Sequence, residues 1–121
     1  MSAAEPASAG LTVVVEVAHT TTHLPPDRAV ITTPALVALM EQCIAMAEPP
    51  PQGQDGRWLS VAADVKHRAG ARRGETIEVR AERRADASVD RAVWQATAKA
   101  EGDRLIAEGT IERLWEAACR E

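Results

Sequence analysis

The sequence predicts an α+β fold in which a curved, five-stranded antiparallel sheet wraps around one central helix. Three observations lead to this prediction. A single helix-like segment, residues 32–47, is apolar nearly all round. One strand-like segment precedes it, and four long strand-like segments follow it. A helix of this kind must be covered on most sides, and a sheet that curls around it is the most economical cover.

The first strand and the helix are separated by a proline-marked loop. Residues 11–22, LTVVVEVAHTTT, are rich in β-branched residues, which favours a strand. The helix is expected to begin with Thr33 as its N-cap and Pro34 at the first helical position, where a missing N–H costs little. The prolines and glycines of residues 48–56 are expected to end the helix and form a loop.

The rest of the chain has the pattern of an antiparallel sheet. Apolar and polar residues alternate with a period of two, most clearly where Ile77 and Val79 alternate with charged neighbours. The predicted strands cover residues 57–69, 75–85, 90–102 and 103–117. One strand, one buried helix and then four long antiparallel strands is the element order of the hotdog fold.

Length and composition are those of one globular domain. We expect residues 1–10 to be a disordered lead-in and residues 11–121 to form a single hotdog domain. Hydrophobic residues make up 45% of the chain and charged residues 26%, the usual balance of a soluble protein. There are three Trp but no Phe and no Tyr, so the core is expected to be aliphatic.

Several function classes are disfavoured by the sequence. A net charge of −4 and the scarcity of aromatic residues argue against nucleic-acid binding. No apolar run approaches the length of a membrane span, and the N-terminus has no signal-peptide pattern. Cys43 and Cys119 have no metal-type spacing, so we expect two reduced thiols in a cytoplasmic protein, no metal site and no cofactor.

Three polar residues stand out by their positions. Thr33 lies at the start of the helix, Glu41 eight residues later inside it, and His67 at the end of the next strand. With these residues, the segments TPALVALME and SVAADVKHRAGARRG resemble the hotdog acyl-CoA thioesterases of the fluoroacetyl-CoA thioesterase type. The resemblance covers nearly the whole chain. In that family a Thr or Ser before the helix, a Glu within it and a His on the following strand form the catalytic set.

The resemblance therefore implies a catalytic set of Thr33, Glu41 and His67. Thioester hydrolysis needs a nucleophile or general base beside the carbonyl group, and Glu41 would fill this role. It would attack directly to give an anhydride or activate a water molecule, and the sequence leaves both routes open. His67 would orient the other two residues or carry a proton to the leaving thiolate. The alternative is structural, with Glu41 on a narrow solvent-facing stripe and Thr33 serving only as a cap.

Two further groups of residues are candidates for substrate binding. The free N–H groups at the N-terminus of the helix are one candidate for stabilising the oxyanion, and by analogy with the family the backbone amides near Leu59 and Ser60 are another. Arg72 and Arg73 would attract the phosphates of coenzyme A, unless they are simply solvated surface residues. The two arginines belong to a basic cluster that consists of Lys66, Arg68, Arg72 and Arg73.

The sequence departs from the family in one respect. The fluoroacetyl-CoA enzyme has a longer segment between the first strand and the helix, with Phe residues that form a lid. Here the segment is the short HLPPDRAVI, and the chain contains no Phe. Fluorine selectivity is therefore not carried over to this chain.

The predicted function is hydrolysis of a short or medium acyl-CoA thioester, with the acyl group and the acyl carrier unassigned. The family usually works as a dimer with acyl pockets at the subunit interface, so we expect a homodimer or a higher homo-oligomer. An edge strand and an apolar face left uncovered in a single chain favour the same expectation. The alternative is a non-catalytic hotdog module that binds acyl thioesters or serves as a dimerisation unit.

Overall fold

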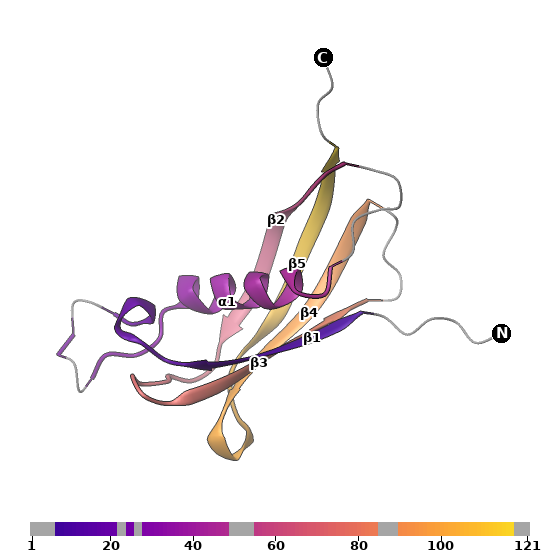
Figure 1. Ribbon diagram of the computed structural model, residues 1–121. Coiled ribbons are helices and arrows are strands. Elements are labelled where there is room, and N and C mark those ends of the chain that lie inside the picture. The colour runs from indigo at the N-terminus through magenta and orange to yellow at the C-terminus, as the bar shows by residue number, and fades with distance from the viewer. Residues whose placement is uncertain (1–6, 22–23, 26–27, 49–54, 85–89, 118–121) are drawn as a thin grey trace.

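The computed structural model describes residues 7–21, 24–25, 28–48, 55–84 and 90–117. Figure 1 shows one helix lying across a long, twisted sheet. In chain order the elements are β1 (Ser8–Val14), η1 (Val17–His19), α1 (Thr33–Ala45), β2 (Gly56–His67), β3 (Thr76–Arg83), β4 (Arg91–Ala100), η2 (Glu101–Asp103) and β5 (Arg104–Ala117).

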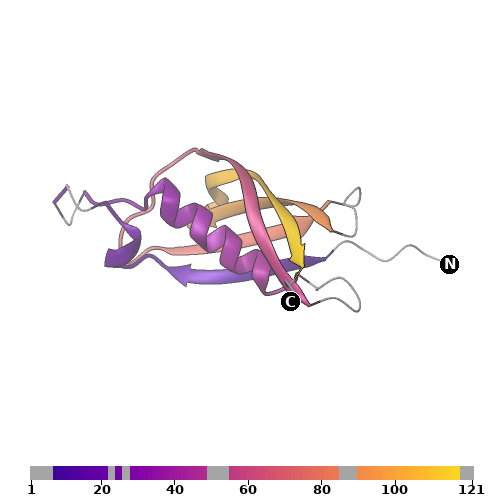
Figure 2. The same cartoon turned by 90° about the horizontal axis from the view of Figure 1, so that it is seen from above.

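The five strands form one antiparallel sheet in the order β1-β3-β4-β5-β2. The chain passes through β3, β4 and β5 as consecutive neighbours, and the strands on either side of the helix in sequence form the two edges. Seen from above, the sheet curls and α1 runs across its concave side (Figure 2). The prediction of a five-stranded curved sheet around one helix is confirmed.

The boundaries agree closely for the last four strands and less well for the first. Each of β2 to β5 begins and ends within two residues of its expected limits. The first strand covers Ser8–Val14 rather than residues 11–22, so its first three residues come from the expected lead-in. The chain then makes a 3₁₀ turn, and Thr20 pairs with Ile31 in an isolated bridge that leads into the helix. Residues 1–6 lie outside the described part of the chain.

The core lies between the inner face of α1 and the concave face of the sheet. The helix buries five residues against the sheet: Leu36, Leu39, Met40, Cys43 and Ile44. Full burial of a side chain the size of leucine contributes about 1.5–3 kcal/mol, so this face holds the helix in place. The core is mainly aliphatic, as expected, but Trp94 is also completely buried in it.

The opposite face of α1 is uncovered in the single chain. Pro34, Ala38, Ala45 and Met46 are exposed along it, and Met46 at the C-cap is 61% accessible. The helix is therefore less enclosed than its apolar sequence predicts, because the sheet covers one side only. Among the described residues, no helix is long and apolar enough to cross a membrane.

Candidate active site

The N-terminus of α1 carries two adjacent threonines with different partners. Thr32 is the N-cap, and its Oγ1 accepts a hydrogen bond of 3.1 Å from the backbone N–H of Ala35. The prediction that Thr33 is the N-cap is wrong by one residue, because the helix begins at Thr33 itself. The Thr33 hydroxyl is therefore not used as a cap and lies 3.0 Å from Nδ1 of His67.

His67 reaches this hydroxyl because it is the last residue of β2, an edge strand that contacts the helix. Both side chains of the pair are exposed in the single chain. In the tautomer that carries its proton on Nε2, the imidazole accepts the hydroxyl proton at Nδ1. The pair can then pass a proton between the solvent side of the imidazole and the threonine oxygen.

Glu41 lies on the same helix, nearer its C-terminal end. Its side chain is 38% accessible, so the carboxylate is partly shielded from water but not buried. Oε2 lies 3.8 Å from Nη1 of Arg113, an electrostatic contact that is too long for a hydrogen bond. The carboxylate therefore has a cation beside it and keeps its own lone pairs available.

Arg113 was not among the residues singled out from the sequence. It lies on β5 and is only 8% accessible. Its neighbour two positions earlier, Ile111, is fully buried, so Arg113 occupies the inward-facing register of the strand. A charge at an inward position of an alternating strand is the signal that could have found it, since buried charges need partners or a function.

Two polar residues complete the surroundings of Arg113. Ser60 is its cross-strand neighbour on β2, and the serine Oγ accepts a 2.8 Å hydrogen bond from Nη1. Glu48, just beyond the helix, accepts from Nη2 at 2.7 Å and from Nε at 3.2 Å. The side chain of Glu48 is only 2% accessible, so this ion pair is buried.

The predicted oxyanion donors lie at an irregular point of β2. The register between β2 and β5 shifts between Ser60 and Ala62, and Val61 between them is 51% accessible. A bulge of this kind interrupts the ladder and re-aims backbone N–H groups. Leu59 and Ser60 thus stand beside an interruption of the ladder. Ser60 contacts Arg113, the same residue that lies beside Glu41.

The site residues form two groups within one chain. Thr33 and Glu41 are eight residues apart on α1, which corresponds to about 12 Å along the helix axis. Along β2, Ser60 and His67 are separated by about 20 Å. The first group is Thr33 with His67, and the second is Glu41 with Arg113, Ser60 and Glu48. Among the described residues, no hydrogen bond or ion pair joins the two groups.

The predicted phosphate-binding arginines differ in their surroundings. The Nε of Arg73 donates a 2.9 Å hydrogen bond to Oγ1 of Thr20, which is 4% accessible, so Arg73 helps to fix the segment before the helix. Arg68 lies 3.4 Å from Glu108 in an exposed ion pair. Arg72 is exposed at the isolated bridge with Val30. Of the two predicted residues, Arg72 is the more exposed.

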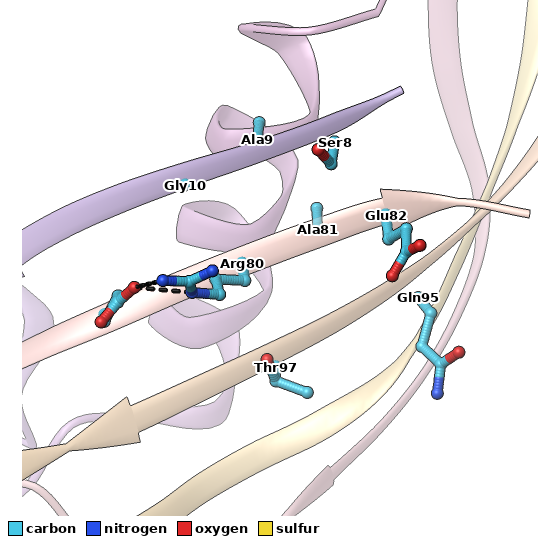
Figure 3. Close-up of a pocket in the computed structure, with 9 residues that line it drawn as sticks. Ser8, Ala9, Gly10, Arg80, Ala81, Glu82, Gln95 and Thr97 are labelled. Carbon is cyan, nitrogen blue, oxygen red and sulfur yellow. Dashed lines mark hydrogen bonds and ion pairs between the residues drawn. The ribbon is translucent and has the colours of Figure 1, made fainter. Parts of the chain in front are cut away.

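A separate hollow of about 700 Å³ lies on the other face of the sheet. Figure 3 shows its side chains over β1, β3 and β4, with α1 behind the sheet. Glu78, Arg80 and Glu82 line it, and they alternate with the buried residues of β3 that face the helix. None of the predicted site residues lines this hollow.

Comparison with known proteins agrees with this fold. The model of the FlK family, fluoroacetyl-CoA-specific thioesterase, matches residues 14–115. The chain belongs to this family. The prediction of an acyl-CoA thioesterase is therefore confirmed at the level of the FlK family. No curated protein matches the chain.

Solved structures give the same result. A point mutant of the fluoroacetyl-CoA-specific thioesterase FlK has a TM-score of 0.76 at 28% identity, over 96% of this chain and 90% of that one. The same mutant in complex with fluoroacetate and CoA has a TM-score of 0.78 at 28% identity, over 94% and 95%. A thioesterase superfamily member from Thermus thermophilus has a TM-score of 0.80 at 21% identity, over 94% and 84%, and supports the hotdog fold alone.

Proposed function

We propose that this FlK-family protein hydrolyses a short or medium acyl-CoA thioester, with Glu41 as nucleophile or general base. The observation that carries the proposal is the state of the Glu41 carboxylate. It is 38% accessible on a mainly apolar helix and stands beside a buried cation without being hydrogen-bonded to it. Such a carboxylate keeps both its charge and its access to a ligand, which the chemistry requires.

Two routes are consistent with this arrangement. In the first, a Glu41 oxygen attacks the thioester carbon, the oxyanion collapses, the C–S bond breaks and an acyl-glutamyl anhydride forms. Water then cleaves the anhydride to release the acid. In the second, Glu41 removes a proton from a water molecule, which attacks the same carbon. In both, the protonated imidazole of His67, which then donates from Nδ1 to Thr33 Oγ1 at 3.0 Å, gives its Nε2 proton to the leaving thiolate. The neutral imidazole regains a proton from the attacking water or from the acid that is released.

We further propose that each site is built from two chains. The two groups of site residues are about 12 Å apart along one helix, so a second chain must bring them together. The free edge of β2 is the surface for this contact, since it is twelve residues long and carries the exposed Val61. The uncovered face of α1 continues the same surface.

An antiparallel pairing of two β2 edges gives the required geometry. A two-fold axis near Ala63 and Asp64 would set Ser60 of one chain level with the partner's His67. Glu41 contacts Arg113, which contacts Ser60, while His67 contacts Thr33. Each of two equivalent sites would then combine Glu41 of one chain with the Thr33 and His67 of the other.

Substrate binding would use the bulge and the basic cluster. The backbone amides of Leu59 and Ser60 are the proposed oxyanion donors, since they adjoin the bulge of β2. Arg72, with Arg73 behind it, is proposed to meet the phosphates of coenzyme A. We place the protein in the cytoplasm, where acyl-CoA thioesters occur and where Cys43 stays reduced.

The test is to mix the purified protein with a panel of acyl-CoA thioesters and a thiol reagent. Release of free coenzyme A from at least one member is expected. Burial raises the pKa of the Cys43 thiol, partly offset by a backbone hydrogen bond from Ala81, so this thiol should add little background. Binding of CoA without any release of thiol would contradict the proposal and favour a non-catalytic binding module.

A further inference from the structure

Arg113 sits between two carboxylates that differ in their surroundings. Glu48 binds it through three contacts of 2.7–3.2 Å and is 2% accessible, whereas Glu41 lies 3.8 Å away and is 38% accessible. The Nε and Nη2 edge of the guanidinium is therefore filled by Glu48, and Nη1 donates to Ser60. Only the weak contact from Nη1 is directed at Glu41.

This division follows from the needs of a buried cation. An arginine whose side chain is only 10% accessible requires a carboxylate partner, because an unpaired buried charge is strongly destabilising. Among the described residues, Glu41 and Glu48 are the carboxylates that form ion pairs with Arg113. If Glu48 did not neutralise it, Glu41 would be the available partner, and a two-contact ion pair would occupy the oxygen lone pairs that the reaction needs.

We infer that Glu48 is a positioning residue for the thioesterase reaction, which acts through Arg113. By holding the guanidinium and neutralising its charge, it keeps Glu41 beside a cation but free to react. The hydrogen bond from Nη1 to Ser60 links the same network to the bulge that carries the proposed oxyanion donors. The inference rests on the proposed function of Glu41 and adds a residue that contacts neither substrate nor reacting atoms.

The experiment compares Glu48→Gln with the parent, and the double variant Glu48→Gln and Arg113→Met with Arg113→Met alone. Loss of the Glu48 charge should turn the guanidinium toward Glu41, and kcat should fall about tenfold or more with KM within about twofold. Without the guanidinium Glu48 has nothing to act through, so kcat of the double variant should lie within about threefold of that of Arg113→Met alone. A merely structural role for Glu48 would not give this split between kcat and KM, nor this loss of the effect when Arg113 is removed.

A matched control is Glu116→Gln. Glu116 also accepts from Nε and Nη2 of an arginine across the same pair of strands, but both members of this pair are exposed, so the charge that is removed is a solvated one. This variant should keep the parent kcat. Thermal unfolding of every variant shows that each rate is measured on folded protein.

Three results would overturn the inference. One is a folded Glu48→Gln protein with kcat within twofold of the parent, and another is a double variant whose kcat is at least tenfold below that of Arg113→Met alone. If Glu48→Gln does not fold by itself, a double variant whose kcat is tenfold above or below that of Arg113→Met alone is the third. Failure of the proposed function is distinct, because it would appear as parent activity in Glu41→Gln whatever Glu48→Gln does.

Discussion

Glu41 and Glu48 show how two identical side chains on one short segment can have different chemical roles. The Glu48 side chain is buried and forms three close contacts with Arg113, so its charge is neutralised by the guanidinium that it holds. Glu41 is partly accessible and keeps one long contact with the same cation. We propose that this difference in accessibility and in the number of hydrogen bonds separates a structural carboxylate, Glu48, from a reactive one, Glu41.

Replacement of the reactive carboxylate gives the first prediction. Glu41→Gln keeps the volume but removes the charge, so kcat should fall roughly 10²–10⁴-fold, the loss expected for a general base. Stability should change by less than about 1 kcal/mol, since the side chain is partly exposed and has one weak contact. Steady-state kinetics and thermal unfolding measure the two effects. Glu78→Gln, on the far face of the sheet, is the control and should have parent kinetics.

The second prediction at this scale concerns coenzyme A. If Arg72 meets its phosphates, Arg72→Ala should raise KM, more strongly at low salt, with little loss of kcat. Arg73→Ala should in addition lower the free energy of unfolding, because the Arg73 side chain donates a hydrogen bond to the buried Thr20. Kinetics at two ionic strengths and thermal unfolding separate these roles. A KM that is unchanged in Arg72→Ala would assign the residue to the solvated surface.

At the level of elements, adjacent residues at the start of α1 make the N-cap and the contact with His67. Thr32 satisfies a free N–H group of the first turn, and Thr33 turns its hydroxyl to His67 on β2. Both are threonines, and TTP occurs once in the chain. The start of α1 therefore brings the Thr33 hydroxyl to the end of the edge strand β2, while Thr32 still caps the helix.

A matched pair of variants follows from this arrangement. Thr32→Ala should lower stability by about 1 kcal/mol, the usual cost of losing an N-cap, and leave kcat unchanged. Thr33→Val, which keeps the shape without the hydroxyl, should lower kcat and leave stability nearly unchanged. Denaturant unfolding and steady-state kinetics on both proteins measure the two effects. The reverse pattern would show that Thr33, not Thr32, is the capping residue.

The strands and the helix could be predicted because their signals are local. Period-two alternation located β3 and β4 within two residues, and the apolar run with its flanking prolines located α1. The end of β1 at Val14 could not be predicted, since the β-branched residues that follow it form a 3₁₀ turn and an isolated bridge fixed by tertiary contacts.

The candidate site could be predicted only in part for a similar reason. The contact of Thr33 with His67 agrees with the resemblance, which brought these residues together from distant positions. The Glu48–Arg113 pair could not be predicted, because three strands separate the two residues in the sequence and they come together only in the folded core. The offset between Thr32 and Thr33 at the cap is also below the precision of sequence patterns.

At the level of the whole molecule, the single chain leaves its candidate site divided. The Thr33–His67 pair and Glu41 lie near opposite ends of one helix, beside one free strand edge. The outward face of that helix is uncovered and mainly apolar, with Gln42 among its exposed residues. A two-fold partner on β2 would cover this surface and join the two groups, so assembly and catalysis would depend on the same contact.

Mixing two inactive variants tests this account most directly. Glu41→Gln and His67→Ala should each be nearly inactive alone, and light scattering should show that the parent has at least twice the mass of its 13.0 kDa chain. After unfolding and refolding together, each mixed dimer should contain one site with Glu41 from one chain and Thr33 and His67 from the other, all unaltered. Random pairing then predicts recovery of about one quarter of the parent rate per chain. If each site belonged to one chain, no mixed dimer would hold an intact site, and a mixture as inactive as its components would contradict the account.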